Sequence, residues 1–223
     1  MRFLIYPSRA DLMSGLAEVI ADALRAAIAE RGRASLSVPG GTTPGPVFDA
    51  LTGADLDWAR VSVFLNDERW VAEDSPRSNT RLLRERLLIG RAAAARLVPL
   101  YAEAARPEDR LDDLISGLKP HLPIDVLLLG MGADMHIASL FPGADRLDEA
   151  LSRQAPLLLP MRAEAAGEPR VTLTAPALIG ARQVHVLITG AEKQTAIRRA
   201  PGLSPAQAPI ALILNQATIH WAE

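Results

Sequence analysis

Short apolar runs separated by segments of helical periodicity are the feature that most constrains this fold. Residues 61–65, 126–129 and 183–189 are mostly apolar and rich in valine, leucine and isoleucine, which suits strands buried on both faces. Residues 10–31 instead place apolar side chains at helical spacing, and Gly32 then stops the helix. The alternation predicts an α/β fold with one doubly wound, mostly parallel sheet and helices on both faces.

The remaining segments fit the same alternation. Since no repeat, low-complexity tract or linker interrupts the chain, we expect one domain over residues 1–223. Further strands are expected at residues 2–6, 34–38, 97–100, 157–160, 171–174 and 210–214, with Pro99 favouring a sheet edge for its strand. Further helices are expected at residues 46–51, 78–88, 107–118, 175–179 and 191–199, and a polar loop from the strand end at 66–69 to Pro76.

Composition excludes several classes of protein. A formal net charge of -2 offers no basic field for nucleic acid. The chain has no cysteine, so it has neither a disulfide framework nor a thiolate zinc site, which suits a reducing cytoplasm. The apolar run at the N-terminus is too short for a signal peptide, and no window approaches the roughly 20 apolar residues of a membrane span.

A glycine-rich loop at residues 39–45 separates an expected strand from an expected helix. Gly40 and Gly41 free backbone N–H groups to face an anion, and Thr42 and Thr43 add hydroxyl donors. The loop matches neither of the glycine motifs that bind nucleotides, so a single phosphate ester is the ligand it suits. A tight turn without a ligand is the alternative, and the loop alone does not decide between the two.

Charged residues follow the next expected strand. Asp67 and Glu68 could supply a base or an orienting carboxylate, and Arg69 could clamp an anion. By themselves these residues are better explained as a solvated charged loop.

The segment from Gly130 to His136 is the strongest candidate for chemistry. Gly130 and Gly132 break an apolar strand, and Asp134 and His136 follow where an open α/β sheet binds its ligands. An imidazole titrates near neutral pH, which suits a general base. No second histidine lies nearby at metal-ligand spacing, so we expect no metal site. A structural histidine that bonds the loop backbone is the alternative, but the position favours function.

Two later cations complete the candidate set. Lys193 falls in the first turn of an expected helix, where the helix dipole prefers an acid, and a bound phosphate would resolve that conflict. Arg170 precedes another expected strand. The alternatives are an exposed cation for Lys193 and, for Arg170, an ion pair with Glu168 or Glu164.

Together these segments resemble the 6-phosphogluconolactonases of the glucosamine-6-phosphate isomerase/deaminase superfamily, nearly end to end. The family hallmark has glycine where this chain has Met135, and methionine there would strain the turn or fill space beside the substrate. The matching segments, in the family's order, are residues 37–44 (SVPGGTTP), 66–71 (NDERWV) with Ser78 and Asn79, 130–142 (GMGADMHIASLFP), 170–174 (RVTLT) and 190–193 (GAEK).

The resemblance implies a Rossmann-like fold of the phosphosugar isomerase/lactonase type and hydrolysis of 6-phospho-D-glucono-1,5-lactone in the oxidative pentose phosphate pathway, without cofactor or metal. His136 would take a proton from the attacking water, with Asp134 or Asp67 orienting its ring. Backbone N–H groups or Arg69 would stabilise the oxyanion. The substrate phosphate would be held by Gly40, Gly41, Thr42, Thr43, Arg170 and Lys193.

Two other functions stay open on the same residues. One is an isomerase/deaminase of amino-sugar phosphates with Asp67 as the carbon base, which the Leu-Phe-Pro at residues 140–142 disfavours. The other is a sugar-phosphate sensor, which the lack of a helix-turn-helix before Arg2 disfavours. The implied partner is a small sugar-phosphate lactone, not nucleic acid or membrane. The implied protein is cytoplasmic and monomeric, with a homodimer as the alternative.

Overall fold

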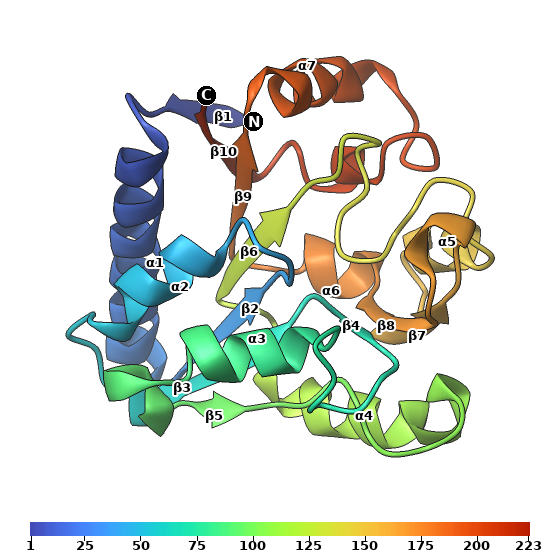
Figure 1. The fold of residues 1–223 in the computed structure, drawn as a ribbon, viewed down its shortest axis with the longest axis horizontal. Coiled ribbons are helices and arrows are strands. Elements are labelled where there is room, and N and C mark those ends of the chain that lie inside the picture. Colours follow the sequence, from blue (N-terminus) through green and yellow to red (C-terminus); the bar gives the residue numbers. More distant parts are fainter.

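A seven-stranded sheet forms the centre of the molecule (Figure 1). The computed structural model describes residues 1–164 and 166–223. All neighbouring strands pair in parallel in the order β1-β10-β9-β6-β2-β3-β5, so the expected α/β fold class is confirmed. The strands are β1 (Arg2–Ile5), β2 (Ala34–Val38), β3 (Val61–Leu65), β5 (Arg96–Leu97), β6 (Val126–Gly130), β9 (Gln183–Thr189) and β10 (Ala217–Ala222).

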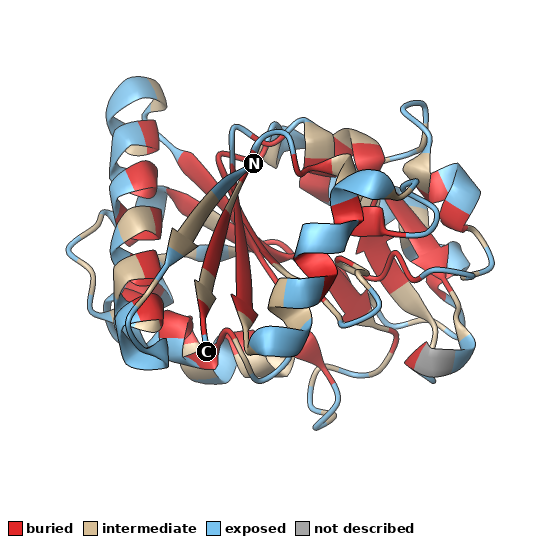
Figure 2. Cartoon of the chain, turned by 90° about the horizontal axis from the view of Figure 1, so that it is seen from above, coloured by how far each residue is buried: buried red, intermediate tan, exposed pale blue. Residues whose placement is uncertain are grey.

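Helices lie on both sides of this sheet, and the strands in its middle are mostly buried (Figure 2). The longest is α1 (Arg9–Arg31), which Ser8 caps by accepting the Asp11 N–H and which ends at Gly32 in a left-handed conformation, as expected. The others are α2 (Gly45–Thr52), α3 (Asn79–Arg86), α4 (Leu111–Leu118), α5 (Leu147–Leu151), α6 (Ala175–Ile179) and α7 (Ala191–Arg199). Short 3-10 turns include η1 (Trp58–Arg60), η2 (Gly90–Ala94), η3 (Pro107–Arg110), η4 (Lys119–His121), η6 (Ala200–Gly202) and η7 (Pro209–Leu212).

A second, three-stranded antiparallel sheet was not expected. It consists of β4 (Asp67–Arg69), β8 (Arg170–Leu173) and β7 (Leu158–Met161), in that order. The strands expected near 157–160 and 171–174 therefore exist, but they belong to this small sheet. The charged segment after β3, expected as a strand end followed by loop, forms β4 because it pairs with β8.

The last strand lies further along the chain than expected. Residues 210–214 are not a strand, because the Ile210 N–H donates to the carbonyl of Met135 at 3.1 Å and the run folds into η7. The strand is instead β10, which pairs with both β1 and β9. His220, expected near the tail, is fully buried within β10.

Parallel pairing aligns the strand ends that matter for function. The carboxyl ends of β2, β3, β6 and β9 all reach one edge of the large sheet. The glycine-rich loop follows β2, the charged segment follows β3, the Asp134–His136 loop follows β6, and α7 follows β9. These four segments are therefore delivered to the same edge.

Candidate active site

A cavity of about 420 Å³ opens at this edge. All the residues that the sequence predicted for the site line the cavity, except Asp134. Asp134 is hydrogen-bonded to His136 instead. The wall includes Gly40, Gly41, Thr42, Thr43, Asp67, Arg69, Asn79, Gly132, His136, Phe141, Arg170 and Lys193.

Asp134 and His136 form a hydrogen-bonded pair. The Asp134 Oδ1 atom lies 2.6 Å from the Nδ1 atom of His136 and also accepts the His136 backbone N–H at 3.2 Å. Because an ionised carboxylate can only accept, the contact favours the tautomer with the proton on Nδ1. The lone pair then lies on Nε2. The imidazole is 29% exposed, so water can reach it.

The loop that carries this pair is a compact turn. The Gly132 N–H donates to the His136 carbonyl, and the Met135 N–H donates to the Gly132 carbonyl, each at 3.0 Å. A Cβ atom on Gly132 would overlap both the His136 ring and the Asp134 carboxylate. Met135 has a φ of 68°, the left-handed region that favours glycine. Its side chain packs against the core and is not in the cavity wall, so of the two expected effects the structure supports strain and contradicts filling beside the substrate.

Phe141 packs between the histidine and an arginine. Its ring centroid lies 4.4 Å from that of His136, at an interplanar angle of 41°. The Arg170 guanidinium carbon lies 5.8 Å from the same Phe141 centroid. Phe141 is 8% exposed and thus fixes the spacing between base and cation.

Asp67 does not contact His136. It is 6% exposed, accepts a short hydrogen bond from the Ser139 hydroxyl, and accepts Arg170 Nη1 at 3.3 Å. Of the two carboxylates considered for orienting the imidazole, the geometry therefore selects Asp134. The alternative considered for Arg170, an ion pair with Glu168 or Glu164, is also wrong, because Arg170 pairs with Asp67 and Glu168 pairs with Arg77.

Arg69 is held beside Arg170 at the cavity wall. Its Nη1 donates to the Arg77 carbonyl at 2.7 Å and to Asn79 Oδ1 at 2.8 Å. Burial, followed by the charge of Arg170, lowers the pKa of Arg69. The Nε atoms of Arg69 and Arg170 are buried and have no hydrogen-bond partner among the residues that the structure describes. The two guanidinium groups at one wall suit a bound anion.

The other two polar residues of this segment are structural. Asn66 is fully buried, where it accepts the Ser37 hydroxyl and donates to the Leu128 carbonyl, and so joins β2, β3 and β6. Glu68 is also fully buried and accepts the N–H groups of Asn79 and Thr80 at the start of α3. The interpretation of this segment as a solvated loop is therefore wrong.

The glycine-rich loop also lines the cavity, next to Asn79. Gly41 has a φ of 85°. A Cβ atom on Gly40 would overlap the Asn79 side chain, so the loop needs glycine to approach Asn79 this closely. Lys193 reaches the cavity from the first turn of α7.

Three supporting residues were not given roles from the sequence: Asn79, Ser139 and Phe141. All of them lie inside the segments that carried the family resemblance, so the signal was present in the sequence. Their contacts with Arg69, Asp67 and His136 depend on tertiary packing, which local patterns do not contain.

No helix within residues 1–164 and 166–223 is long and apolar enough to cross a membrane. The same described part of the chain holds no cluster of three or more histidine, aspartate or glutamate side chains suited to a metal ion.

Comparisons with known proteins agree with the geometry. Residues 7–221 match the family model described as glucosamine-6-phosphate isomerases/6-phosphogluconolactonase. The chain is 45% identical to a 6-phosphogluconolactonase of Mesorhizobium japonicum, over 97% of this chain and 93% of the relative. It is 42% identical to one of Rhizobium meliloti, over 98% and 97%. A crystal structure of a 6-phosphogluconolactonase from Shewanella baltica superposes with a TM-score of 0.96 at 34% identity, covering 100% of this chain and 98% of that one.

Proposed function

This chain belongs to the glucosamine-6-phosphate isomerase/6-phosphogluconolactonase family, and we propose that it hydrolyses 6-phospho-D-glucono-1,5-lactone to 6-phosphogluconate. The Asp134–His136 pair carries the proposal, because it sets a base at the wall of a cavity whose other walls hold cations and a glycine-rich loop. The names of the curated relatives support the lactone as the substrate.

His136 acts as the general base. Asp134 accepts a hydrogen bond from the N–H group at Nδ1 and fixes the ring, so Nε2 is free to take a proton from water. The water oxygen bonds to C1 of the lactone, and the π electrons of the C1 carbonyl move onto its oxygen. The carbonyl then re-forms as the bond from C1 to the ring oxygen breaks. His136 then returns the proton to the departing ring oxygen, and the enzyme ends in its starting state.

Arg69 stabilises the negative charge that develops on the carbonyl oxygen. The guanidinium lines the cavity and is oriented by Asn79, so it needs no reorganisation when the charge appears. Asp67 serves a different purpose from the one first considered. Its hydrogen bonds to Ser139 and Arg170 suit a residue that positions Arg170.

The phosphate end of the substrate occupies the side of the cavity formed by the glycine-rich loop. Gly40 and Gly41 let the backbone approach the phosphate, and Thr42 and Thr43 offer hydroxyl groups. Lys193 and Arg170 provide opposite charge, which positions the lactone carbonyl relative to His136.

Loss of lactone above its spontaneous rate, set against release of ammonia from glucosamine 6-phosphate, tests the proposal. We expect lactone loss only, and we expect His136→Ala to lower kcat by about 100-fold or more, the range that a positioned base supplies. Near-normal turnover by folded His136→Ala protein would contradict the general base. Ammonia release would favour the isomerase/deaminase function instead.

Three further expectations belong to this proposal. No cofactor or metal is required, so activity should survive dialysis against a chelator. The reaction takes place in the cytoplasm, which the absence of cysteine supports. The chain works as a monomer, with a homodimer as the alternative, and light scattering of the purified protein distinguishes the two.

A further inference from the structure

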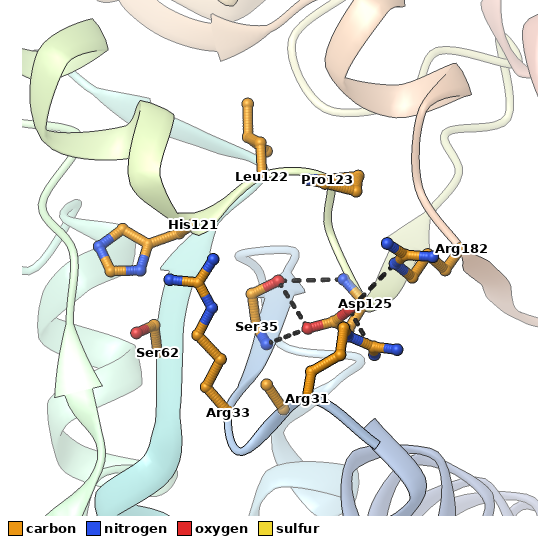
Figure 3. Close-up of a pocket in the computed structure, with 10 residues that line it drawn as sticks. Arg31, Arg33, Ser35, Ser62, His121, Leu122, Pro123, Asp125 and Arg182 are labelled. Atoms are coloured by element: carbon orange, nitrogen blue, oxygen red, sulfur yellow. Dashed lines mark hydrogen bonds and ion pairs between the residues drawn. The ribbon is translucent and has the colours of Figure 1, made fainter. Parts of the chain in front are cut away.

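A second cavity lies at the opposite edge of the large sheet, where β2, β3, β6 and β9 begin (Figure 3). Because a five-residue strand such as β6 spans about 16 Å, it is separate from the candidate active site. Its volume is about 90 Å³, enough for one small ion, since a water molecule takes up roughly 30 Å³ of liquid. Its polar lining consists of Arg31, Arg33, Ser35, Ser62, His121, Asp125 and Arg182.

Asp125 is the one carboxylate among the described residues of this lining, and its charge is already compensated. Arg31 Nη2 lies 2.7 Å and Arg182 Nε lies 3.4 Å from its Oδ1 atom. Its other oxygen accepts the Ser35 N–H at 2.8 Å. Arg31 also pairs with Glu30, which lies outside the lining. Three arginines against these two carboxylates still leave the cavity with net positive charge.

Arg33 supplies the uncompensated charge. No ion pair or side-chain hydrogen bond joins Arg33 to the rest of the chain as the structure describes it, and Figure 3 shows its guanidinium turned toward His121. The pKa of His121 is lowered, first by burial and then by the charges of Arg96 and Arg33. The field that opposes a proton on His121 attracts an anion into the same space.

We propose that this cavity binds a small oxyanion of the phosphate class. Arg33 provides a planar fork of donors that matches phosphate oxygens. The Ser62 hydroxyl and the N–H groups of Arg182 that Asp125 leaves free complete the set. The volume admits one phosphate group, either as the free ion or as the end of an ester whose remainder projects into solvent. Because the ion joins segments before β2, β6 and β9, it stabilises the folded chain by mass action.

The test is a titration of the full chain with inorganic phosphate, followed by NMR of the imidazole groups. Sodium chloride keeps the ionic strength constant, and His121→Asn assigns the His121 signal. We expect that signal to shift saturably. His136 reports separately on the proposed active site, so the two sites are told apart.

Arg33→Gln should raise the dissociation constant seen at His121 by at least tenfold, while leaving lactone hydrolysis unchanged. The matched control is Arg153→Gln, an exposed arginine outside the cavity lining, which should bind as the wild type does. A sugar phosphate that binds more tightly than inorganic phosphate at His121 would identify an ester as the ligand, and weaker binding would identify the free ion.

Three results would overturn the proposal. One is a His121 signal that stays fixed up to tens of millimolar phosphate. Another is an equal shift with chloride alone, which would mean charge screening. The third is a response that Arg33→Gln leaves intact.

Discussion

A side chain at Gly132 would occupy the space that Asp134 and His136 fill. We expect Gly132→Ala to displace the pair and to lower kcat by about 100-fold, because a misplaced base loses most of its effect. Gly117→Ala in α4 is the matched control, since nothing lies within 4 Å of its added Cβ. That variant should keep full turnover and gain up to about 1 kcal/mol of stability. Steady-state kinetics measures the turnover of each variant, and urea unfolding measures its stability. Equal turnover of Gly132→Ala and Gly117→Ala would contradict the catalytic role of the Asp134–His136 pair.

Substitutions at Met135 test whether its left-handed backbone conformation matters for catalysis or only for the shape of the turn. Its φ of 68° costs about 1–2 kcal/mol for a residue with a side chain, and the thioether packs against the core. Met135→Gly should therefore keep kcat and KM, with relief of strain offset by lost packing. Met135→Val should be less stable than Met135→Ala in urea, because branching at Cβ is worse at positive φ. A large rise in KM for Met135→Gly would mean that the methionine touches the substrate.

At the residue scale, most side chains selected from the sequence line one cavity, but the sequence did not give their directions. Asp67, Glu68 and Arg69 are adjacent and similar in polarity. Because they form β4, successive side chains point to opposite faces, so Asp67 and Arg69 line the cavity while Glu68 turns inward to α3. That distinction requires the pairing of β4 with β8, which local sequence does not reveal.

At the element scale, Glu68 ties β4 to the start of α3. It accepts the N–H groups of Asn79 and Thr80 and the Ser78 hydroxyl, whose oxygen also caps the helix. Glu68→Gln removes the charge and leaves fewer acceptors for buried donors, so we expect a loss of about 1–3 kcal/mol in urea unfolding. Since Asn79 also holds Arg69, kcat should fall as well.

Glu85→Gln provides the comparison within α3. Glu85 is an exposed residue whose partner is Arg81, and such surface pairs contribute about 0–1 kcal/mol. We expect nearly unchanged stability and turnover for it. If Glu68→Gln were equally harmless, the proposed link from Glu68 through Asn79 to Arg69 would be wrong.

Elements with strong periodicity were predictable, and the misplaced last strand has a physical reason. β2, β3, β9, α6 and α7 begin and end where the sequence predicts. The run at 210–214 is apolar enough for a strand, but it packs in the core below the Asp134–His136 loop as η7. β10 was missed because it contains the polar residues Thr218 and His220. His220 can be buried there because its ring nitrogens have hydrogen-bond partners in Tyr6 and His185.

At the scale of the whole molecule, the site lies between two sheets. The large sheet delivers the glycine-rich loop, the Asp134–His136 loop and Lys193, and these could be placed together from the rule for parallel strand ends. The small sheet delivers Asp67, Arg69 and Arg170. Its antiparallel register joins segments about a hundred residues apart, such as Asp67 with Thr172, and that choice of partner is made by packing.

β10, near the C-terminus of the chain, joins β1 to the rest of the large sheet by pairing with both β1 and β9 (Figure 1). His220 Nε2 lies 3.0 Å from His185 Nδ1, and His220 Nδ1 lies 2.8 Å from the Tyr6 hydroxyl. Burial lowers the pKa of His185 to about 4. Burial, with the charges of His185 and Arg2, lowers the pKa of His220 to about 3. Both rings are therefore neutral in the folded protein at any pH where the sheet is intact.

This network makes the fold sensitive to acid. In the unfolded chain each imidazole has a pKa near 6.5, above its folded value, so protonation favours unfolding. The stability from keeping both rings neutral is complete above about pH 7 and is lost as the pH falls from 6.5 toward 4, at about 2 kcal/mol per histidine by pH 5. Urea unfolding at about pH 7.5 and pH 5 measures the loss, and pH 5 still lies above most carboxylate titration. His185→Asn should lower stability at both values yet shrink the difference between them by about 2 kcal/mol, the share of one histidine. If the variant lost as much stability as the wild type between the two pH values, acid sensitivity would have to come from groups other than this buried pair.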